Sequence, residues 1–325
     1  GIHRNLALYQ DKVLLGTSDA HLVALNAASG TVAWDVAAAD SSQGYSYTAG
    51  PIAGDGRVFA SLTCNGGTAH CFVSAHDVAT GMELWRRETV AGPKDSAEVN
   101  ATWNGFAYEK RAKASMWMAG GYDPALKRVF WTTGSAYPYT EVAKGTPGST
   151  NLYTQSIMAL NADGGALAWY RQLVPRDNFD LDHADNPILA DVLIGGGVRR
   201  VVFTMGKPSV LWALDRQTGE HLWHRLVVPF QNIYKTIDDK TGAITMNEDA
   251  IPKTASGFQL ICPGMRGGKI FQAKSYSPQA DAVVSAVSLA CSNFELLPVD
   301  KSAQGFNWDR MEPMPNSNGN VGRLA

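Results

Sequence analysis

One short segment gathers many of the side chains in this sequence that could do acid–base or metal chemistry. Residues 175–185 read Pro-Arg-Asp-Asn-Phe-Asp-Leu-Asp-His-Ala-Asp, with four carboxylates and one histidine within eleven residues. Carboxylates this close repel one another unless a cation or a shared proton relieves the repulsion, and hard divalent cations take oxygen ligands of this kind. The spacing matches no calcium loop of the EF-hand type. Taken alone, the segment indicates either a site for a cation or shared proton, or a solvated acidic loop.

Lys207 is a second candidate for chemistry. It stands in the run Met205-Gly206-Lys207-Pro208-Ser209, at the predicted end of a strand. A lysine between glycine and proline contributes little to packing, so its charge could face an anion or a quinone oxygen. The alternative is an ordinary surface lysine.

A repeat indicates the elements that must position these side chains. Its unit is an Ala followed ten residues later by a Trp, with a turn between them, and it covers residues 24–34, 75–85, 159–169 and 213–223. Recurrence of one inner spacing indicates that a single supersecondary unit is reused. Asn or Asp at the start of the turn and Gly at its end favour a tight hairpin. The flanking runs are rich in β-branched and aromatic residues, as strands are.

We therefore predict an all-β fold, namely a β-propeller of four-stranded antiparallel blades, with residues 1–325 in a single domain. The indole of each repeat is large and apolar and carries one N–H, which suits a joint between adjacent blades. We interpret these residues as architecture rather than catalysis. They are Trp34, Trp85, Trp169 and Trp223.

The overall composition excludes two classes of partner. The 325 residues have a formal net charge of −2, so no basic face indicates nucleic-acid binding. The longest apolar runs are too short to span a bilayer, and no transmembrane segment is expected. No signal-peptide pattern is visible at the start. The chain lacks an initiator Met, so we expect it to begin inside a longer protein or to be a mature form.

Four cysteines, Cys64, Cys71, Cys262 and Cys291, permit two disulfides in three pairings. The simplest connectivity joins Cys64 to Cys71, across a glycine-rich loop, and Cys262 to Cys291. Disulfides would indicate an oxidising compartment, which is the periplasm for a bacterial protein. Four free buried thiols in a cytosolic chain are the alternative. No Cys-x-x-Cys-His run is present, so we expect no c-type haem on this chain.

Other stretches, in order along the whole chain, resemble one known family. They are Arg4-Asn5-Leu6-Ala7, Thr48-Ala49-Gly50-Pro51, Gly120-Gly121-Tyr122-Asp123-Pro124, Met205-Gly206-Lys207, Leu211-Trp212-Ala213-Leu214-Asp215-Arg216, Cys262-Pro263 and Gly267-Gly268-Lys269. With the Ala–Trp repeat, they resemble the pyrroloquinoline quinone (PQQ) dependent alcohol dehydrogenases, the quinoprotein relatives of methanol dehydrogenase. The resemblance implies an eight-bladed propeller of roughly twice this length. The chain is then an interior fragment, about half of the ring or slightly more, and we expect the fragment alone to be inactive.

The resemblance also implies an activity: oxidation of a primary or secondary alcohol or a polyol, with hydride transferred to PQQ and electrons passed to cytochrome c or a quinone. Asp180 matches the catalytic Asp, the general base for the substrate hydroxyl. Lys207 matches a basic residue beside the quinone oxygens, where a cation stabilises developing charge. Trp117 matches the floor on which the cofactor stacks. Arg4 and Thr48 match residues that hold its carboxylates and oxygens.

At the positions that bind the family's metal ion, which is usually calcium, this sequence departs from the family's ligand pattern. The family takes a Glu from the loop that here reads Asn65-Gly66-Gly67-Thr68, and an Asn from the turn that here reads Gly134-Ser135-Ala136. The ligands that the resemblance leaves are Asp180, Ser135 at the position of the Asn, and Asp182, which would supply an oxygen in a distinct branch of the family.

Two other interpretations stay open. Propellers with the same docking motif also serve as non-catalytic binding and assembly scaffolds, so fold alone does not establish an enzyme. A degenerate dehydrogenase that has lost its metal is the second. Ile270 and Phe271 also replace the Asn and Trp that the family places after Gly-Gly-Lys. A binding scaffold would not need four such side chains together, so their presence favours an enzyme. They are Asp180, Lys207, Trp117 and Arg4.

Overall fold

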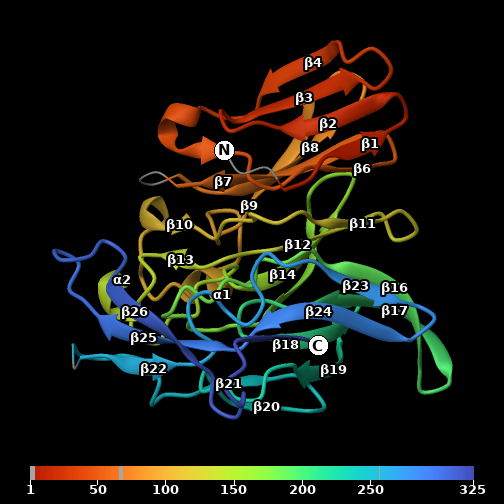
Figure 1. Cartoon of the computed structure of the whole chain (residues 1–325). Coiled ribbons are helices and arrows are strands. Elements are labelled where there is room, and N and C mark those ends of the chain that lie inside the picture. The colour runs from red at the N-terminus through yellow and green to blue at the C-terminus, as the bar shows by residue number, and fades with distance from the viewer. Residues whose placement is uncertain (1–3, 66–68, 256) are drawn as a thin grey trace.

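Antiparallel sheets make up most of the regular secondary structure in the computed structural model, which describes residues 4–65, 69–255 and 257–325 (Figure 1). The first sheet has the order β1 (Ala7–Tyr9), β2 (Lys12–Gly16), β3 (His21–Asn26), β4 (Val32–Ala37). The second has the order β5 (Tyr45–Ser46), β7 (Arg57–Cys64), β8 (Phe72–Asp77), β9 (Glu83–Glu88), with β6 (Ile52–Gly54) also paired to β7.

Two further four-stranded sheets follow. They are β11 (Gly121–Asp123), β12 (Arg128–Thr132), β14 (Ser156–Asn161), β15 (Leu167–Gln172), and then β16 (Ile188–Ile194), β17 (Gly197–Thr204), β18 (Val210–Asp215), β19 (His221–Leu226). The predicted all-β class and the four-stranded antiparallel blades are thus confirmed.

The remaining strands form smaller sheets. They are β10 (Ala112–Lys113) with β13 (Ala136–Tyr137), β20 (Tyr234–Ile237) with β21 (Ile244–Met246), the set β22 (Gln259–Ile261), β25 (Ala290–Leu296), β26 (Phe306–Pro313), and the set β23 (Lys274–Ser277), β24 (Ala282–Ser288), β27 (Gly322–Leu324). In the residues that the structure describes, helix is limited to α1 (Ala97–Ala101), α2 (Glu141–Lys144) and the single 3-10 turns η1 (Ser41–Gln43) and η2 (Tyr108–Lys110).

The ten-residue spacing from Ala to Trp has a simple structural origin. In every repeat the two residues are cross-strand partners, as Ala75 and Trp85 are in the hairpin β8–β9. One register shift follows the Ala in each hairpin, which is typical of a β-bulge. The turn is closed by the Asp or Asn side chain: Asp77 Oδ1 accepts from Ala79 N (3.0 Å) and Thr80 N (2.9 Å).

Three of the four repeat indoles join neighbouring sheets, as predicted. Trp34 Nε1 donates to Val78 O (3.0 Å), Trp85 Nε1 to Ala162 O (2.9 Å) and Trp169 Nε1 to Arg216 O (3.2 Å). Each acceptor lies in the turn of the next repeat. The fourth indole, Trp223, packs beside Phe203 of its own sheet, with ring centroids 5.7 Å apart.

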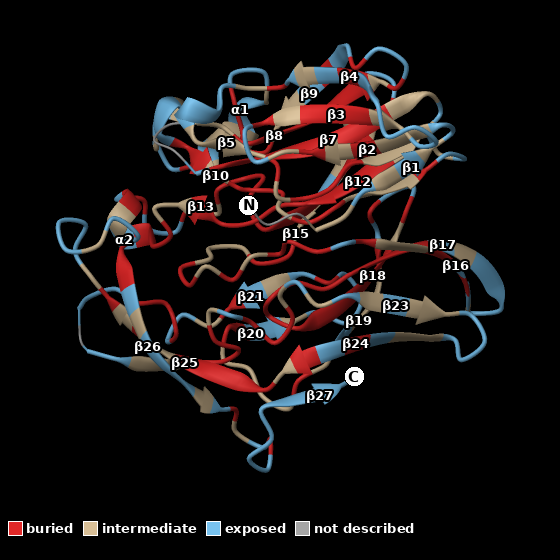
Figure 2. Cartoon of the chain, turned by 45° about the horizontal axis from the view of Figure 1, so that its top comes forward, coloured by how far each residue is buried: buried red, intermediate tan, exposed pale blue. Residues whose placement is uncertain are grey.

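The apolar core follows these joints. Buried side chains form clusters between successive sheets, and one such cluster joins Phe59, Val73 and Trp85 of the second sheet to Val129 and Leu160 of the third. Figure 2 shows buried residues on strands such as β3, β7, β12 and β25, and in loops near the centre of the view. Loops and strand ends from several of these sheets line one cavity.

Both predicted disulfides are present. Cys64–Cys71 and Cys262–Cys291 have Cα–Cα distances of 5.1 and 4.5 Å, within the range that a disulfide spans. The first pair joins the last residue of β7 to the residue before β8. The glycines between them, at 66 and 67, lie outside the described residues.

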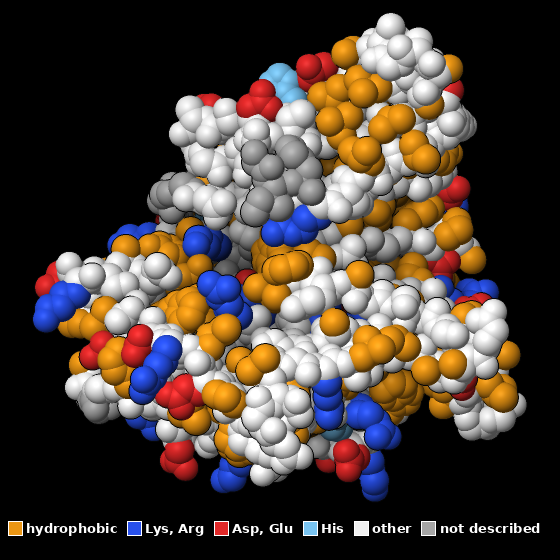
Figure 3. Space-filling view, viewed as in Figure 1, with side chains coloured by type: hydrophobic (Ala, Val, Ile, Leu, Met, Phe, Trp, Pro, Cys, Tyr) orange, Lys and Arg blue, Asp and Glu red, His pale blue; other side chains and the backbone are white. Residues whose placement is uncertain are grey.

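Within the described part of the chain, no helix has the length and apolar character needed to cross a membrane. Figure 3 shows positive, negative and apolar side chains interspersed on one face, with several Lys and Arg side chains near the middle of the view.

Candidate active site

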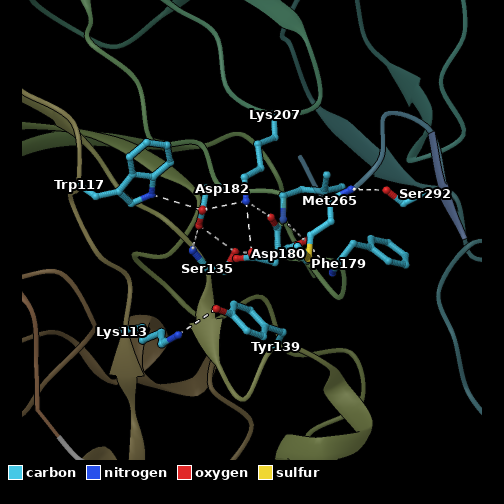
Figure 4. A network of polar contacts seen from close by, with 12 residues as sticks. Lys113, Trp117, Ser135, Tyr139, Phe179, Asp180, Asp182, Lys207, Met265 and Ser292 are labelled. Atoms are coloured by element: carbon cyan, nitrogen blue, oxygen red, sulfur yellow. Dashed lines mark hydrogen bonds and ion pairs between the residues drawn. The ribbon is translucent and has the colours of Figure 1, made fainter. Parts of the chain in front are cut away.

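The predicted site residues come together around one cavity of about 250 Å³. Loops and strand ends far apart in the sequence contribute to its wall, from Arg4 before β1 to Asp182 between β15 and β16. The lining residues are Arg4, Thr48, Thr63, Asn65, Lys113, Ser115, Trp117, Ser135, Tyr139, Asp180 and Asp182. Of the residues proposed from sequence, only Lys207 is not part of this lining, and it contacts two residues that are (Figure 4).

The acidic segment owes its shape to alternating apolar and acidic side chains. Phe179 and Leu181 are fully buried in the core, so the intervening Asp180 and the following Asp182 face the cavity. Asp180 has a φ of +57°. Such a backbone is uncommon outside glycine and is retained where the surroundings determine it.

Asp177 is the residue that determines this loop, and sequence reasoning gave it no separate role. Its carboxylate accepts from Phe179 N (3.0 Å), Leu181 N (3.2 Å), Ser135 Oγ (2.8 Å) and Gln155 Nε2 (2.7 Å). Burial raises the pKa of Asp177, although the hydrogen bonds from Phe179 N, Ser135 Oγ and Leu181 N act against the increase. It therefore organises the loop rather than facing the cavity.

Asp182 is fixed by donors from three directions. Its Oδ1 accepts from Ser135 N (2.8 Å) and Ser135 Oγ (3.1 Å), and its Oδ2 from Trp117 Nε1 (3.3 Å). Lys207 Nζ lies 3.0 Å from the same Oδ2. A side chain at Gly134 would collide with Asp182 Oδ1, which explains the glycine before Ser135.

Lys207 connects the two carboxylates. Its Nζ lies 3.3 Å from Asp180 Oδ2 and also donates to the Asp180 carbonyl. Its backbone is held in turn, because Lys207 N donates to Asp182 O (3.0 Å) and Gly268 N donates to Lys207 O (2.9 Å). A Cβ at Gly267 would lie 2.6 Å from Lys207 Cα, so the Gly-Gly pair is needed for this close approach.

The electrostatics of Asp180 and Lys207 suit a general base that acts near neutral pH. Burial, together with the charge of Asp182, raises the pKa of Asp180 to about 7, while Lys207 acts to lower it. Burial alone would lower the pKa of Lys207, but the carboxylates of Asp180 and Asp182 dominate and raise it. Lys207 is therefore a permanent cation beside a carboxyl that titrates near pH 7.

A second group of lining residues offers a flat platform and a cation. The Arg4 guanidinium lies over the Trp117 ring, 4.9 Å from its centroid, and donates to Thr48 O (3.1 Å). Thr48 Oγ1 shares a hydrogen bond of 2.7 Å with Thr63 Oγ1. The face of Trp117 thus already accepts a planar charged group.

These residues fit a flat, acidic quinone such as PQQ. Trp117 supplies a stacking surface, Arg4 a fork that matches carboxylates, and Thr48 a hydroxyl. Lys207 supplies a buried cation at the acidic end of the site. Phe271, which stands where the family has a Trp, is 61% exposed and does not line this cavity.

A calcium ion fits the described residues less well. Calcium takes about six to eight oxygen ligands, whereas the described residues contain no group of three or more His, Cys, Asp or Glu that could hold a metal. Both Asp182 oxygens already accept protein hydrogen bonds, and the Lys207 ammonium stands between Asp182 and Asp180. The donor set does not fit, and the ligand set Asp180, Asp182 and Ser135 stays a prediction from sequence.

A comparison with known proteins decides the family. Residues 3–232 match the family model for PQQ, described as the glucose/ethanol/alcohol dehydrogenase β-propeller domain. The chain belongs to this PQQ-dependent dehydrogenase family.

Individual relatives agree with this PQQ-dependent family. The chain is 32% identical to quinohemoprotein alcohol dehydrogenase ADH-IIG of Pseudomonas putida, over 91% of this chain and 43% of the relative. It is 28% identical to the lanthanide-dependent methanol dehydrogenase of Methylorubrum extorquens, over 99% of this chain and 58% of the relative. A solved europium-containing methanol dehydrogenase shares the fold, with a TM-score of 0.89 at 23% identity, over 99% of this chain and 59% of that one. The chain thus spans about half the length of the curated relatives it matches.

Proposed function

We propose that the protein containing this chain is a PQQ-dependent alcohol dehydrogenase that oxidises a primary or secondary alcohol or a polyol. The observation that carries the proposal is the pair of Asp180 and Lys207 at a cavity that also holds a stacking indole and an arginine. When bound, PQQ supplies the acceptor for the hydride that leaves the alcohol carbon.

Asp180 would act as the general base. Lys207 engages Asp180 Oδ2 and the Asp180 carbonyl, and among the described residues no hydrogen bond reaches Asp180 Oδ1. That oxygen is open to accept the proton of a substrate hydroxyl. Because the pKa of Asp180 is about 7, the carboxylate is available near neutral pH and becomes a neutral acid after the transfer.

Lys207 would stabilise negative charge at the same place. Its ammonium is fixed by two carboxylates and a carbonyl, so it needs no reorganisation as charge develops nearby. Arg4 and Thr48 would hold the acidic edge of the cofactor, and Trp117 would keep its plane.

We also propose a periplasmic location, with transfer of electrons to cytochrome c or a quinone. The two disulfides support an oxidising compartment. The names of two relatives mention these acceptors: an alcohol dehydrogenase (quinone) subunit of Gluconacetobacter polyoxogenes and a lupanine 17-hydroxylase [cytochrome c] of Pseudomonas.

The test is a reconstitution of the full-length protein. The purified protein is titrated with PQQ, once with calcium and once with a chelator, and each sample is assayed by dye reduction with a panel of alcohols. Saturable PQQ binding followed by alcohol-dependent reduction is expected. PQQ binding without turnover on any alcohol would favour the degenerate enzyme, and absence of binding under both conditions would favour the scaffold.

A further inference from the structure

A second cavity of about 570 Å³ adjoins the first one. The two cavities share Asn65, Lys113 and Tyr139, so these three side chains stand at their border. Figure 4 shows Lys113 and Tyr139 joined by a hydrogen bond, near Ser135 and Asp180. The other lining residues of the second cavity are Cys64, Ala112, Tyr137 and Gln304.

Lys113 stands at this border and, among the described residues, has no carboxylate within ion-pair distance. Its Nζ donates to Tyr139 OH (2.9 Å) and lies 4.7 and 5.0 Å from the ring centroids of Tyr137 and Tyr139. Among the ion pairs of the described residues, none includes Lys113, whereas Lys207 already pairs with Asp180 and Asp182. Two of the three protons of this ammonium are therefore available to an acceptor from either cavity.

The backbone at this position would favour glycine. Lys113 has a φ of +67° and the next residue, Ala114, a φ of +57°. An L-residue is disfavoured in the left-handed region because its Cβ lies too close to the following carbonyl oxygen. The conformation is held by the pairing of Lys113 with Ala136 and by an isolated bridge to His70. A long cationic side chain thus stands where the fold would accept glycine at lower cost, as is common at ligand-binding sites.

We propose that Lys113 binds the carboxylate of an acidic alcohol, so that hydroxy acids are preferred substrates of this site. The inference rests on the proposed function, because it places the substrate hydroxyl at Asp180. Lys113 and Asp180 line the same cavity of about 250 Å³, and Lys113 also lines the adjoining cavity of about 570 Å³. The substrate would lie with its hydroxyl at Asp180 and its carboxylate at Lys113. Tyr139 provides an aromatic ring at the border, and the second cavity adds the ring of Tyr137 and the polar side chain of Gln304.

A carboxylate of PQQ could supply the same chemistry, and the experiment separates the two sources. The reconstituted full-length protein is assayed with 4-hydroxybutyrate and with 1-butanol, and the Kd for PQQ is measured in parallel. The variants are Lys113→Met and Lys113→Gly, with Lys110→Met as the matched control. Lys110 is an exposed lysine three residues earlier, and it lines neither cavity. Glycine adopts a positive φ readily, so Lys113→Gly keeps the backbone.

The expected result is a fall of about ten- to a hundredfold in the ratio of kcat/KM for 4-hydroxybutyrate to that for 1-butanol, as befits the loss of a hydrogen bond to a charged group. Both Lys113 variants should show it, Lys113→Arg should restore most of the ratio, and Lys110→Met should keep it. An unchanged ratio would overturn the proposal. A PQQ Kd that rises while both substrates lose activity equally would assign Lys113 to the cofactor and also overturn it.

A binding measurement distinguishes failure of this inference from failure of the proposed function. Calorimetry with butyrate and with butyramide requires no turnover. Butyrate binding that is lost in Lys113→Gly, in a protein that oxidises no alcohol, would support the carboxylate site and refute the dehydrogenase. Alcohol oxidation with equal binding of butyrate and butyramide would refute the carboxylate site alone.

Discussion

The turn glycine of each repeat provides a direct test of the joints between sheets. Gly165 has a φ of +70°, and a Cβ at this position would lie 2.5 Å from Cε3 of Trp85. We predict that Gly165→Ala destabilises the chain through two separate effects. An alanine in the left-handed region costs about 1–2 kcal/mol, and forcing a group into the packed joint costs about 1–3 kcal/mol more.

Gly30 is the matched control for this substitution. It occupies the same turn position in the first repeat with a φ of +73°, but a Cβ there would meet nothing within 4 Å. Gly30→Ala should therefore cost only the backbone term, about 1–2 kcal/mol. The free energy of unfolding of the 325-residue chain, measured by urea denaturation and circular dichroism, should fall further in Gly165→Ala by about 1–3 kcal/mol.

Equal losses of stability in the two variants would refute this reasoning. Such a result would mean that the Trp85 ring does not pack on the turn of the next repeat. A loss confined to Gly30→Ala would contradict it more strongly, because no neighbouring side chain lies at that position.

Three further predictions concern the site and its supports. The kcat/KM for alcohol should rise as the pH increases through about 7, because Asp180 must lose its proton before it can accept one, and a flat profile between about pH 5 and 9 would argue against that base. Asp185→Asn should cost about 3–5 kcal/mol in a denaturation experiment, since it leaves the buried ammonium groups of Lys269 and Lys274 without their shared carboxylate. Replacing the cysteines at 262 and 291, which are separated by 29 residues, with serine should cost about 3–4 kcal/mol in the same experiment, and an unchanged midpoint would contradict a structural role.

The parts of the fold that sequence predicts are those set by local pairing. The Ala–Trp spacing is visible because it is the register of a single hairpin, as with Ala159 and Trp169. The placement of Asp180 and Asp182 also follows from a local pattern, in which alternate residues, Phe179 and Leu181, enter the core.

Other features depend on contacts that no local pattern encodes. Lys113 reaches the cavity border because β10 pairs with β13 and because its backbone takes a positive φ, and its sequence surroundings show neither. The cluster of Asp185 with Lys269 joins residues 84 positions apart. The sequence gives only a weak signal that Asp177 differs in role from the other aspartates of the segment. That signal is its position two residues before Phe179, whose backbone N–H donates to it.

Asp180→Asn tests the central claim most directly. The variant keeps the shape of the side chain but removes its ability to accept a proton from the substrate. In the reconstituted full-length protein we predict that PQQ still binds while kcat falls by about a hundredfold or more. Turnover at the wild-type rate with the cofactor bound would show that the carboxylate beside Lys207 is not the base, and the account of this site would be wrong.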